Sequence, residues 1–153
     1  GTLADALAVN AASKLHFGTA TVVRFIAGLA SALRHVHARR ILHRDLKTAN
    51  VFLTDEAEPN VKLGDFGVSR LFSTETHLAE TMCGTPYYLS PELVRGLPYS
   101  QPSDVWALGV ILFELLTLKR PFSAPNGALG ALVMAITTGA RKPDAFPRGC
   151  PRG

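Results

Sequence analysis

The sequence predicts a mainly α-helical fold with one short β-hairpin, and three observations support this. Over residues 19–40, apolar side chains recur at three- and four-residue steps, which is the period of an amphipathic helix. A nearly continuous apolar stretch covers residues 105–118. It is shorter than the roughly 20 residues that cross a bilayer, so it predicts a buried helix. Two short runs of β-type residues lie between these segments.

The N-terminal third predicts two helices. Residues 3–9 predict a short first helix, and residues 10–18 predict a loop. Residues 19–40 predict the second helix, with Thr19 or Thr21 as its N-cap. Its apolar face would consist of Val22, Ile26, Leu29, Leu33 and Val36.

The middle of the chain predicts a hairpin and then a long loop. The runs 51–53 and 61–63 are short and of β-type, and the polar residues 54–60 join them as a turn. Residues 64–103 are rich in Ser, Thr, Gly and Pro and lack periodicity, so they predict a loop of a length that usually has a function.

The C-terminal part predicts a buried helix over residues 104–118, interrupted by Glu114, and a further helix over residues 127–138. The apolar positions of the further helix are Leu129, Leu132, Val133 and Ile136. The last residues, 141–153, contain three Pro and three Arg and are not expected to fold.

Composition argues against several functional classes. Sixteen Lys and Arg against twelve Asp and Glu give a formal charge of +4, but these charges are scattered and no RNA motif or zinc-finger spacing accompanies them, so nucleic acid is not an expected partner. Cys83 and Cys150 are too few for a disulfide framework, and no targeting or membrane segment is visible. We therefore expect an intracellular location, cytoplasmic or nuclear.

The strongest chemical signal is the run at residues 43–50, HRDLKTAN. Phosphoryl transfer needs a carboxylate that orients the attacking hydroxyl, a cation for the transferring phosphate and an oxygen ligand for a metal ion. Asp45, Lys47 and Asn50 supply these three groups at the spacing of a protein-kinase catalytic loop.

A second carboxylate follows at Asp65, in the tripeptide DFG at residues 65–67, directly after the expected hairpin. Mg²⁺ is usually held by one or two protein oxygens plus substrate phosphates, so Asn50 and Asp65 suffice as metal ligands if ATP supplies the rest. Alone, DFG is a common turn and HRD a common surface charge cluster. Together they predict ATP-dependent phosphoryl transfer.

The chain resembles the C-terminal lobe of a eukaryotic protein kinase, from its first residues to about Gly139. Beyond the catalytic loop, residues 84–92 (GTPYYLSPE) resemble the end of an activation segment, with Ser90 in place of the usual Ala, and residues 103–109 (SDVWALG) resemble the start of the central helix. Lys47 together with residues 84–85 is the pattern of Ser/Thr kinases. Three segments resemble the NIMA-related kinases, namely 47–53, 87–92 and 129–133.

The resemblance implies roles for further residues around ATP and the activation segment. Phe52 would form the floor beneath the adenine, although a buried hairpin residue is also plain core. Thr81 would be the activating phosphorylation site, with Arg44 as the partner of its phosphate. Thr85 would steady Asp45 and Lys47. Other candidates for the phosphorylated residue are Ser73, Thr74 and Thr76, and Thr81 as a simple exposed loop residue is a further alternative.

The resemblance also implies structural roles within the lobe. His43 would pack on Phe66, and Asp104 would hold the backbone of the catalytic loop from below. Glu92 would pair with an Arg that the family carries beyond residue 139, and no residue in 141–153 matches it. We therefore expect Glu92 to be a buried carboxylate without a partner.

The 153 residues contain no Gly-rich phosphate loop, no strand Lys and no helix with its partner Glu. We therefore interpret residues 1–140 as a partial kinase domain, the large C-terminal lobe without the N-terminal lobe, and expect negligible activity and weak ATP affinity from the chain alone. The expected function is transfer of the ATP γ-phosphoryl group to Ser or Thr of protein substrates. The alternative is a catalytically silent remnant that serves as a protein-binding module.

Overall fold

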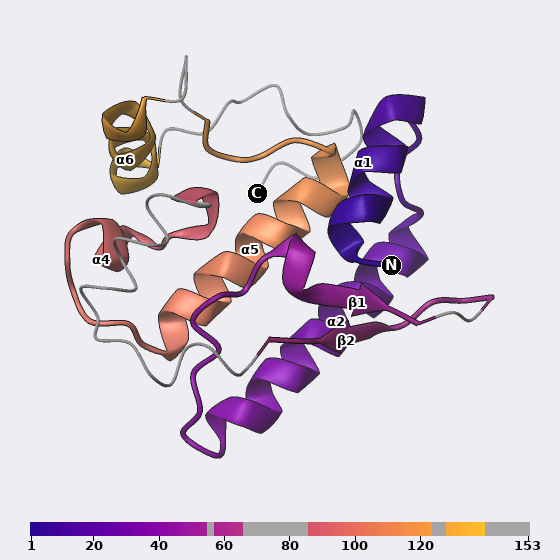
Figure 1. The fold of residues 1–153 in the computed structure, drawn as a ribbon, viewed down its shortest axis with the longest axis horizontal. Coiled ribbons are helices and arrows are strands. Elements are labelled where there is room, and N and C mark those ends of the chain that lie inside the picture. Colours follow the sequence, from indigo (N-terminus) through magenta and orange to yellow (C-terminus); the bar gives the residue numbers. More distant parts are fainter. Residues whose placement is uncertain (55–56, 66–85, 124–127, 140–153) are drawn as a thin grey trace.

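The computed structural model describes residues 1–54, 57–65, 86–123 and 128–139 and confirms a mainly helical fold with one two-stranded antiparallel sheet (Figure 1). None of the helices in these ranges is long and apolar enough to span a membrane. The elements in chain order are α1 (Leu3–Ser13), α2 (Thr19–His37), η1 (Thr48–Asn50), β1 (Val51–Leu53), β2 (Val61–Leu63), η3 (Pro86–Tyr88), α4 (Pro91–Val94), α5 (Gln101–Thr117) and α6 (Leu129–Thr138).

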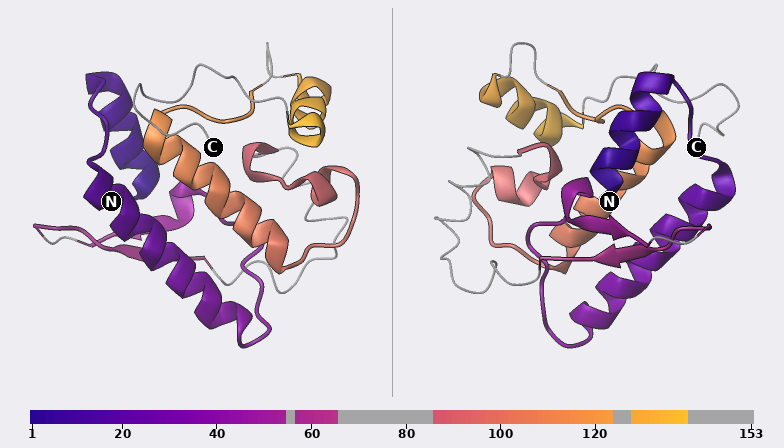
Figure 2. Two further views of the ribbon diagram at one scale, coloured as in Figure 1. Left: turned by 180° about the vertical axis from the view of Figure 1, so that it is seen from behind. Right: turned by 45° about the vertical axis from the view of Figure 1, so that its right-hand side comes forward.

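Helix α5 lies at the centre of the molecule. It packs against α2 on one side, while α4 and α6 lie on its other side, as both views in Figure 2 show. The hairpin lies against α2, and the approach is so close at Gly28 that a Cβ there would meet Val61 at 2.7 Å. The main core joins these elements through Leu3, Val22, Phe25, Leu29, Leu33, Leu46, Val51, Ala107, Ile111 and Leu115.

The hairpin has the predicted strand bounds, and its register pairs Val51 with Leu63 and Phe52 with Lys62. The N-terminus adds to its edge, because the N–H of Leu53 donates to the carbonyl of Gly1 at 2.9 Å. This pairing brings the start of α1 against the hairpin, so that both lie next to the catalytic-loop run.

Three of the predictions for helix ends in the N-terminal third are wrong: the end of the first helix, and both the N-cap and the end of the second. Helix α1 continues to Ser13, through part of the expected loop, and it begins with a capping box between Thr2 and Asp5. Helix α2 begins after Gly18 in extended conformation, so neither predicted threonine is its N-cap. Helix α2 ends at His37 and does not reach residue 40, and α1 ends where Lys14 takes a left-handed φ of 56° and its N–H donates to the Ala11 carbonyl. Local residue preferences place such boundaries only to within a few residues.

In its described part, the expected loop at 64–103 contains two short helical elements that the sequence analysis missed, η3 and α4. The short helix α4 has Pro91 at its first position, where the missing N–H of proline costs nothing. Helix α5 begins at Gln101, three residues before its predicted start, because Ser100 and Ser103 form a capping box. Helix α6 begins at Leu129, and the predicted tail 141–153 lies outside the described residues.

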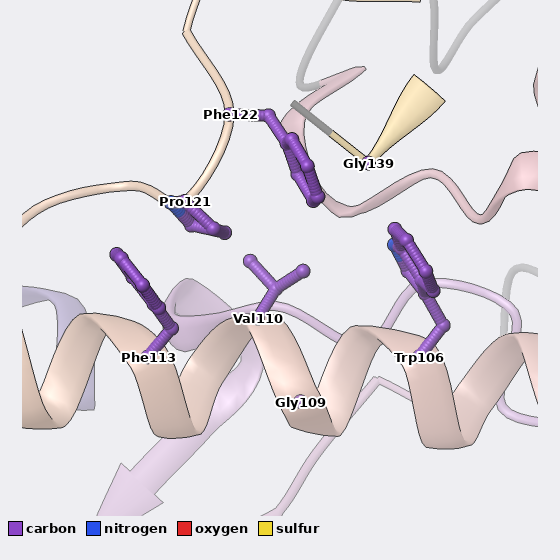
Figure 3. A pocket seen from close by; sticks show the side chains of 7 residues that line it. All are labelled: Trp106, Gly109, Val110, Phe113, Pro121, Phe122 and Gly139. Carbon is purple, nitrogen blue, oxygen red and sulfur yellow. The ribbon is translucent and has the colours of Figure 1, made fainter. Parts of the chain in front are cut away.

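A second, smaller apolar cluster lies between α5 and α6. Trp106 of α5 stacks on Phe122 with ring centroids 5.6 Å apart and planes inclined by 8°. Beside this pair is an apolar cavity of about 330 Å³, into which Val110 and Phe113 of α5 also point (Figure 3). No residue of the catalytic-loop run lines this cavity, so it is separate from the candidate active site.

Candidate active site

The catalytic-loop run is anchored at its start by a buried carboxylate of α5. Asp104 is 0% exposed and accepts the N–H of His43 at 3.0 Å and the N–H of Arg44 at 3.1 Å. Hydrogen bonds to an ionised acceptor are stronger than neutral ones, so this carboxylate fixes the entry to the loop. The resemblance predicted this role for Asp104, and these contacts confirm it.

Two further side chains that the sequence analysis missed complete the surroundings of Asp104. His37, at the end of α2, donates from Nε2 to Oδ2 at 2.7 Å, and the Tyr99 hydroxyl donates to Oδ1 at 2.5 Å. Each carboxylate oxygen therefore accepts two hydrogen bonds. A signal was present in the sequence, because a charged residue in a buried helix requires partners. Nothing in the local pattern identifies which residues those partners are.

The imidazole of His43 ties the catalytic loop to the end of the hairpin. Its Nε2 donates to the carbonyl of Gly64 at 2.9 Å, and its Nδ1 accepts the N–H of Asp45 at 3.3 Å. One nitrogen donates and the other accepts, so the ring is neutral. Burial lowers the pKa of His43 below its usual value, against the opposing effects of Gly64 and nearby carboxylates, and this favours the neutral ring. Phe66, the predicted neighbour of this ring, lies outside the described residues.

Asp45, Lys47 and Asn50 form one hydrogen-bonded group. The Lys47 ammonium donates to both Asp45 carboxylate oxygens, at 3.0 and 2.8 Å. The Asn50 amide nitrogen donates to the Asp45 carbonyl at 2.8 Å and to Asp45 Oδ2 at 2.9 Å. The Asp45 and Lys47 side chains are 39% and 26% exposed, so the group is open to solvent on one side. A carboxylate and a cation are thus presented together at the surface.

The backbone brings Asp65 next to this group. The N–H of Gly64 donates to the carbonyl of Asn50 at 2.9 Å, and Asp65 is the next residue, exposed and with a left-handed φ of 60°. Asp65 and Asp45 both act electrostatically on the His43 ring. The two predicted metal ligands, Asn50 and Asp65, therefore lie at neighbouring backbone positions at the end of the hairpin.

Phe52 lies on the adjacent strand β1 and is 42% exposed. Its ring lies directly over Gly64, where a Cβ would clash with it. The ring is therefore on the outside of the hairpin and not in the core. An exposed aromatic face beside the two candidate ligands is able to stack on a flat apolar group.

The predicted regulatory residues are placed only in part. Arg44 has a left-handed φ of 68° and is half-buried, with its N–H on Asp104. Thr81 and Thr85 lie outside the described residues, as do the alternatives Ser73, Thr74 and Thr76. The pairing of Arg44 with a phosphate on Thr81 and the support of Asp45 by Thr85 thus stay predictions.

The expectation for Glu92 is wrong. Glu92 is half-buried and accepts the Ser103 hydroxyl at 2.6 Å. Burial raises the pKa of Glu92, but hydrogen bonds from Ser103 and from its own backbone outweigh this and hold the pKa below its usual value. The capping box that starts α5 early is the physical reason, because it brings Ser103 against α4.

Comparison with known proteins adds to this geometry. The family model described as "Protein kinase domain" matches residues 1–141. The chain is 44% identical over 135 residues to serine/threonine-protein kinase Nek1 of Mus musculus, covering 88% of this chain and 11% of that protein. It is 47% identical over 143 residues to serine/threonine-protein kinase Nek8 of Danio rerio, covering 94% of this chain and 20% of that protein.

A third relative, serine/threonine-protein kinase Nek9 of Mus musculus, is 50% identical over 105 residues, covering 69% of this chain and 10% of that protein. The chain thus spans a fifth or less of the length of these curated relatives. The similarity to the Nek proteins confirms the resemblance to NIMA-related kinases that residues 47–53, 87–92 and 129–133 indicated.

Proposed function

Because the chain belongs to the protein kinase domain family, we propose that it is the part of a serine/threonine-protein kinase that transfers the γ-phosphoryl group of ATP to Ser or Thr hydroxyls of protein substrates. The observation that carries this proposal is the hydrogen-bonded group of Asp45, Lys47 and Asn50, with Asp65 at the neighbouring backbone position. All four polar side chains that the chemistry requires are present, so nothing favours the silent alternative.

Asp45 has the role of orienting the substrate hydroxyl and accepting its proton. Its carboxylate is partly exposed, so a hydroxyl is able to reach it, and its position is fixed by Lys47 and Asn50. General bases positioned in this way contribute about 10²- to 10⁴-fold to the rate. Lys47 has the role of balancing negative charge on the transferred group, and its ammonium already lies against the oxygen atoms where the proton is taken up.

The residues present fit a magnesium ion. Asn50 uses its amide nitrogen on Asp45, which leaves its amide oxygen for a metal, and Asp65 is exposed, so its carboxylate is accessible to a metal. Amide and carboxylate oxygens are the hard ligands that Mg²⁺ prefers, and two are enough when phosphates supply others. When bound, Mg²⁺ would offset the charge of the ATP phosphates. Asn50 also fixes Asp45 through its amide nitrogen, so it would link the metal site to the base.

The exposed ring of Phe52 has the role of stacking on the adenine of ATP, and protein substrates carrying Ser or Thr are the proposed partners. Regulation would act through phosphorylation of Thr81, whose added negative charge Arg44 would pair with. We also propose a cytoplasmic or nuclear location. The roles of Phe52, Thr81 and Arg44 are those that the resemblance to protein kinases implies.

Phosphotransfer by a chimera tests the proposed function. The segment of mouse Nek1 that precedes its matched region is joined before Gly1, because the present residues supply no Gly-rich loop. We expect phosphate transfer from labelled ATP to Ser or Thr of a generic protein substrate. Asp45→Asn should lower kcat at least about 100-fold, since it removes the base. Asp5→Asn, the same change at an exposed carboxylate in the first turn of α1, should leave kcat unchanged.

Absence of transfer by the parent chimera, or an unchanged kcat after Asp45→Asn, would contradict the proposed function. The chain alone is assayed in parallel. We expect no transfer above background from it. If the chain alone transfers phosphate and Asp45→Asn abolishes this transfer, then the expectation of negligible activity without an N-terminal lobe is wrong.

A further inference from the structure

Three polar side chains from separate parts of the chain form a hydrogen-bonded series beneath the catalytic loop. The Thr48 hydroxyl oxygen lies 2.9 Å from the Tyr88 hydroxyl oxygen, and the Tyr88 hydroxyl donates to Glu114 Oε2 at 2.6 Å. Thr48 is the first residue of η1, Tyr88 is the last of η3, and Glu114 lies in α5. The series therefore connects the turn that carries Asn50 to the central helix.

The donor at each step is fixed. A carboxylate only accepts, so the single proton of the Tyr88 hydroxyl is used on Glu114, and Thr48 must donate to the Tyr88 oxygen. Burial and the neighbouring Glu114 raise the pKa of Tyr88 far above its usual value, which keeps the phenol protonated. The series thus runs in one direction, from Thr48 through Tyr88 to Glu114.

The far end of the series is anchored. Burial raises the pKa of Glu114, while hydrogen bonding by Tyr88 and the charge of Arg120 oppose this. Arg120 Nε lies 3.5 Å from Glu114 Oε1, and its guanidinium carbon is 3.8 Å from the centroid of the Tyr87 ring. Glu114 is therefore held both by its place in α5 and by a cation that stacks on an aromatic ring.

The near end of the series is where the catalytic loop turns. The N–H of Asn50 donates to the Lys47 carbonyl at 3.0 Å, and the N–H of Val51 donates to the Thr48 carbonyl, which closes η1. This turn directs the Asn50 amide onto Asp45. Thr48 is buried, and the space left among the loop, Tyr88 and the neighbouring side chains is only about 20 Å³, room for about one water.

We propose that Tyr88 and Thr48 are positioning residues, whose hydroxyl series to Glu114 fixes the turn at residues 48–50 so that Asn50 holds Asp45 in place. The catalytic meaning of this role rests on the proposed function. Asp104 anchors the start of the loop, and Gly64 pairs with the Asn50 carbonyl. The Tyr88 series is a further anchor, and it holds the loop at Thr48, between Lys47 and Asn50, a position that the contacts of Asp104 and Gly64 do not include.

The first experiment measures amide hydrogen exchange of the whole 153-residue chain and compares Thr48→Val with Thr48→Ser. Valine has nearly the shape of threonine but lacks the hydroxyl, whereas serine retains the hydroxyl. In Thr48→Val the amides of Asn50 and Val51 should exchange about tenfold faster than in Thr48→Ser, the size expected for one net hydrogen bond. The amide of Leu115, buried in α5, should exchange at the same rate in both variants.

This readout separates positioning from a merely structural role. An increase confined to the turn amides supports the proposal. Equal acceleration at Leu115 shows a loss of global stability, and equal exchange of the turn amides in both variants shows that the hydroxyl fixes nothing, so either result overturns the proposal. The measurement needs neither ATP nor substrate, so its outcome does not depend on whether the chain takes part in phosphotransfer.

The second comparison is Tyr88→Phe against Tyr87→Phe. Each substitution removes one hydroxyl, and the two tyrosines are adjacent in the chain. The Tyr87 ring stacks on the Arg120 guanidinium, and the phenylalanine ring retains this contact. Tyr88→Phe should accelerate exchange of the turn amides by the same factor as Thr48→Val, and the double variant should add little to either change, because both break one series. Additive effects, or an equal effect of Tyr87→Phe, would overturn the proposal.

Discussion

Replacing Asp104 with asparagine is the sharpest test of how the catalytic loop is anchored. The side chain is fully buried, and four donors converge on it, two on each oxygen: Arg44 N–H and Tyr99 on Oδ1, His43 N–H and His37 on Oδ2. Asparagine has nearly the same shape but turns one oxygen into an NH₂ group. Whichever oxygen is replaced, two of the four donors then face another donor.

The magnitude follows from those two lost contacts. Hydrogen bonds to a charged acceptor contribute about 1.5–3 kcal/mol each, so losing two costs about 3–6 kcal/mol. The neutral amide is easier to bury than a carboxylate, which offsets part of this cost. We therefore expect Asp104→Asn to lower the free energy of unfolding by about 3 kcal/mol, a large share of the ~5–15 kcal/mol typical of a domain.

The assay is urea unfolding followed by circular dichroism near pH 7.5. Tyr99→Phe, which removes one of the four donors, should cost about 1.5–3 kcal/mol, and its cost should shrink in the Asp104→Asn background. Tyr87→Phe, whose hydroxyl is not part of this cluster, should stay within about 0.5 kcal/mol of the parent. A cost of Asp104→Asn below about 1 kcal/mol, or full additivity with Tyr99→Phe, would refute the reasoning.

Three further results are expected. Gly28→Ala should lower the free energy of unfolding in urea by about 1 kcal/mol, because overpacking against β2 costs about 1–3 kcal/mol and the gain in helix propensity is only ~1 kcal/mol. Gly130→Ala has open space at its Cβ and should raise the free energy of unfolding. Equal effects of the two substitutions would contradict the packing argument. Burial lowers the pKa of His43 below 6.5, so the unfolded chain binds a proton first and stability should fall as pH drops below that value. His43→Gln should flatten this dependence, and an unchanged slope would exclude His43 as its source. In the chimera, Asn50→Ala and Asp65→Ala should each raise the Mg²⁺ concentration for half-maximal phosphotransfer by about tenfold or more, and an unchanged requirement would exclude that residue as a ligand.

Much of the fold and of the candidate site could be predicted from local patterns. The hairpin strands, whose β-type residues are confined to three positions each, have the predicted bounds, and the helical period placed α2 and α6. Asp45, Lys47 and Asn50 lie within six residues, so the chain itself brings them together once the loop turns. Helix ends were less predictable. Helix α1 continues to Ser13, past its expected end at residue 9, and the capping box at Ser100 starts α5 before its expected first residue.

The sequence by itself determined which chemical groups the catalytic loop carries and that Asp104 and Glu114 would lie in a buried helix. Only the tertiary structure decided which side chains satisfy those carboxylates: His37 is 67 residues from Asp104, and Tyr88 is 26 residues from Glu114. The physical reason is that burying a charge demands hydrogen-bond donors without specifying their place in the sequence. The packing of α2, η3 and α5 around one core brings those donors to the carboxylates. No periodic pattern along the chain predicts these contacts.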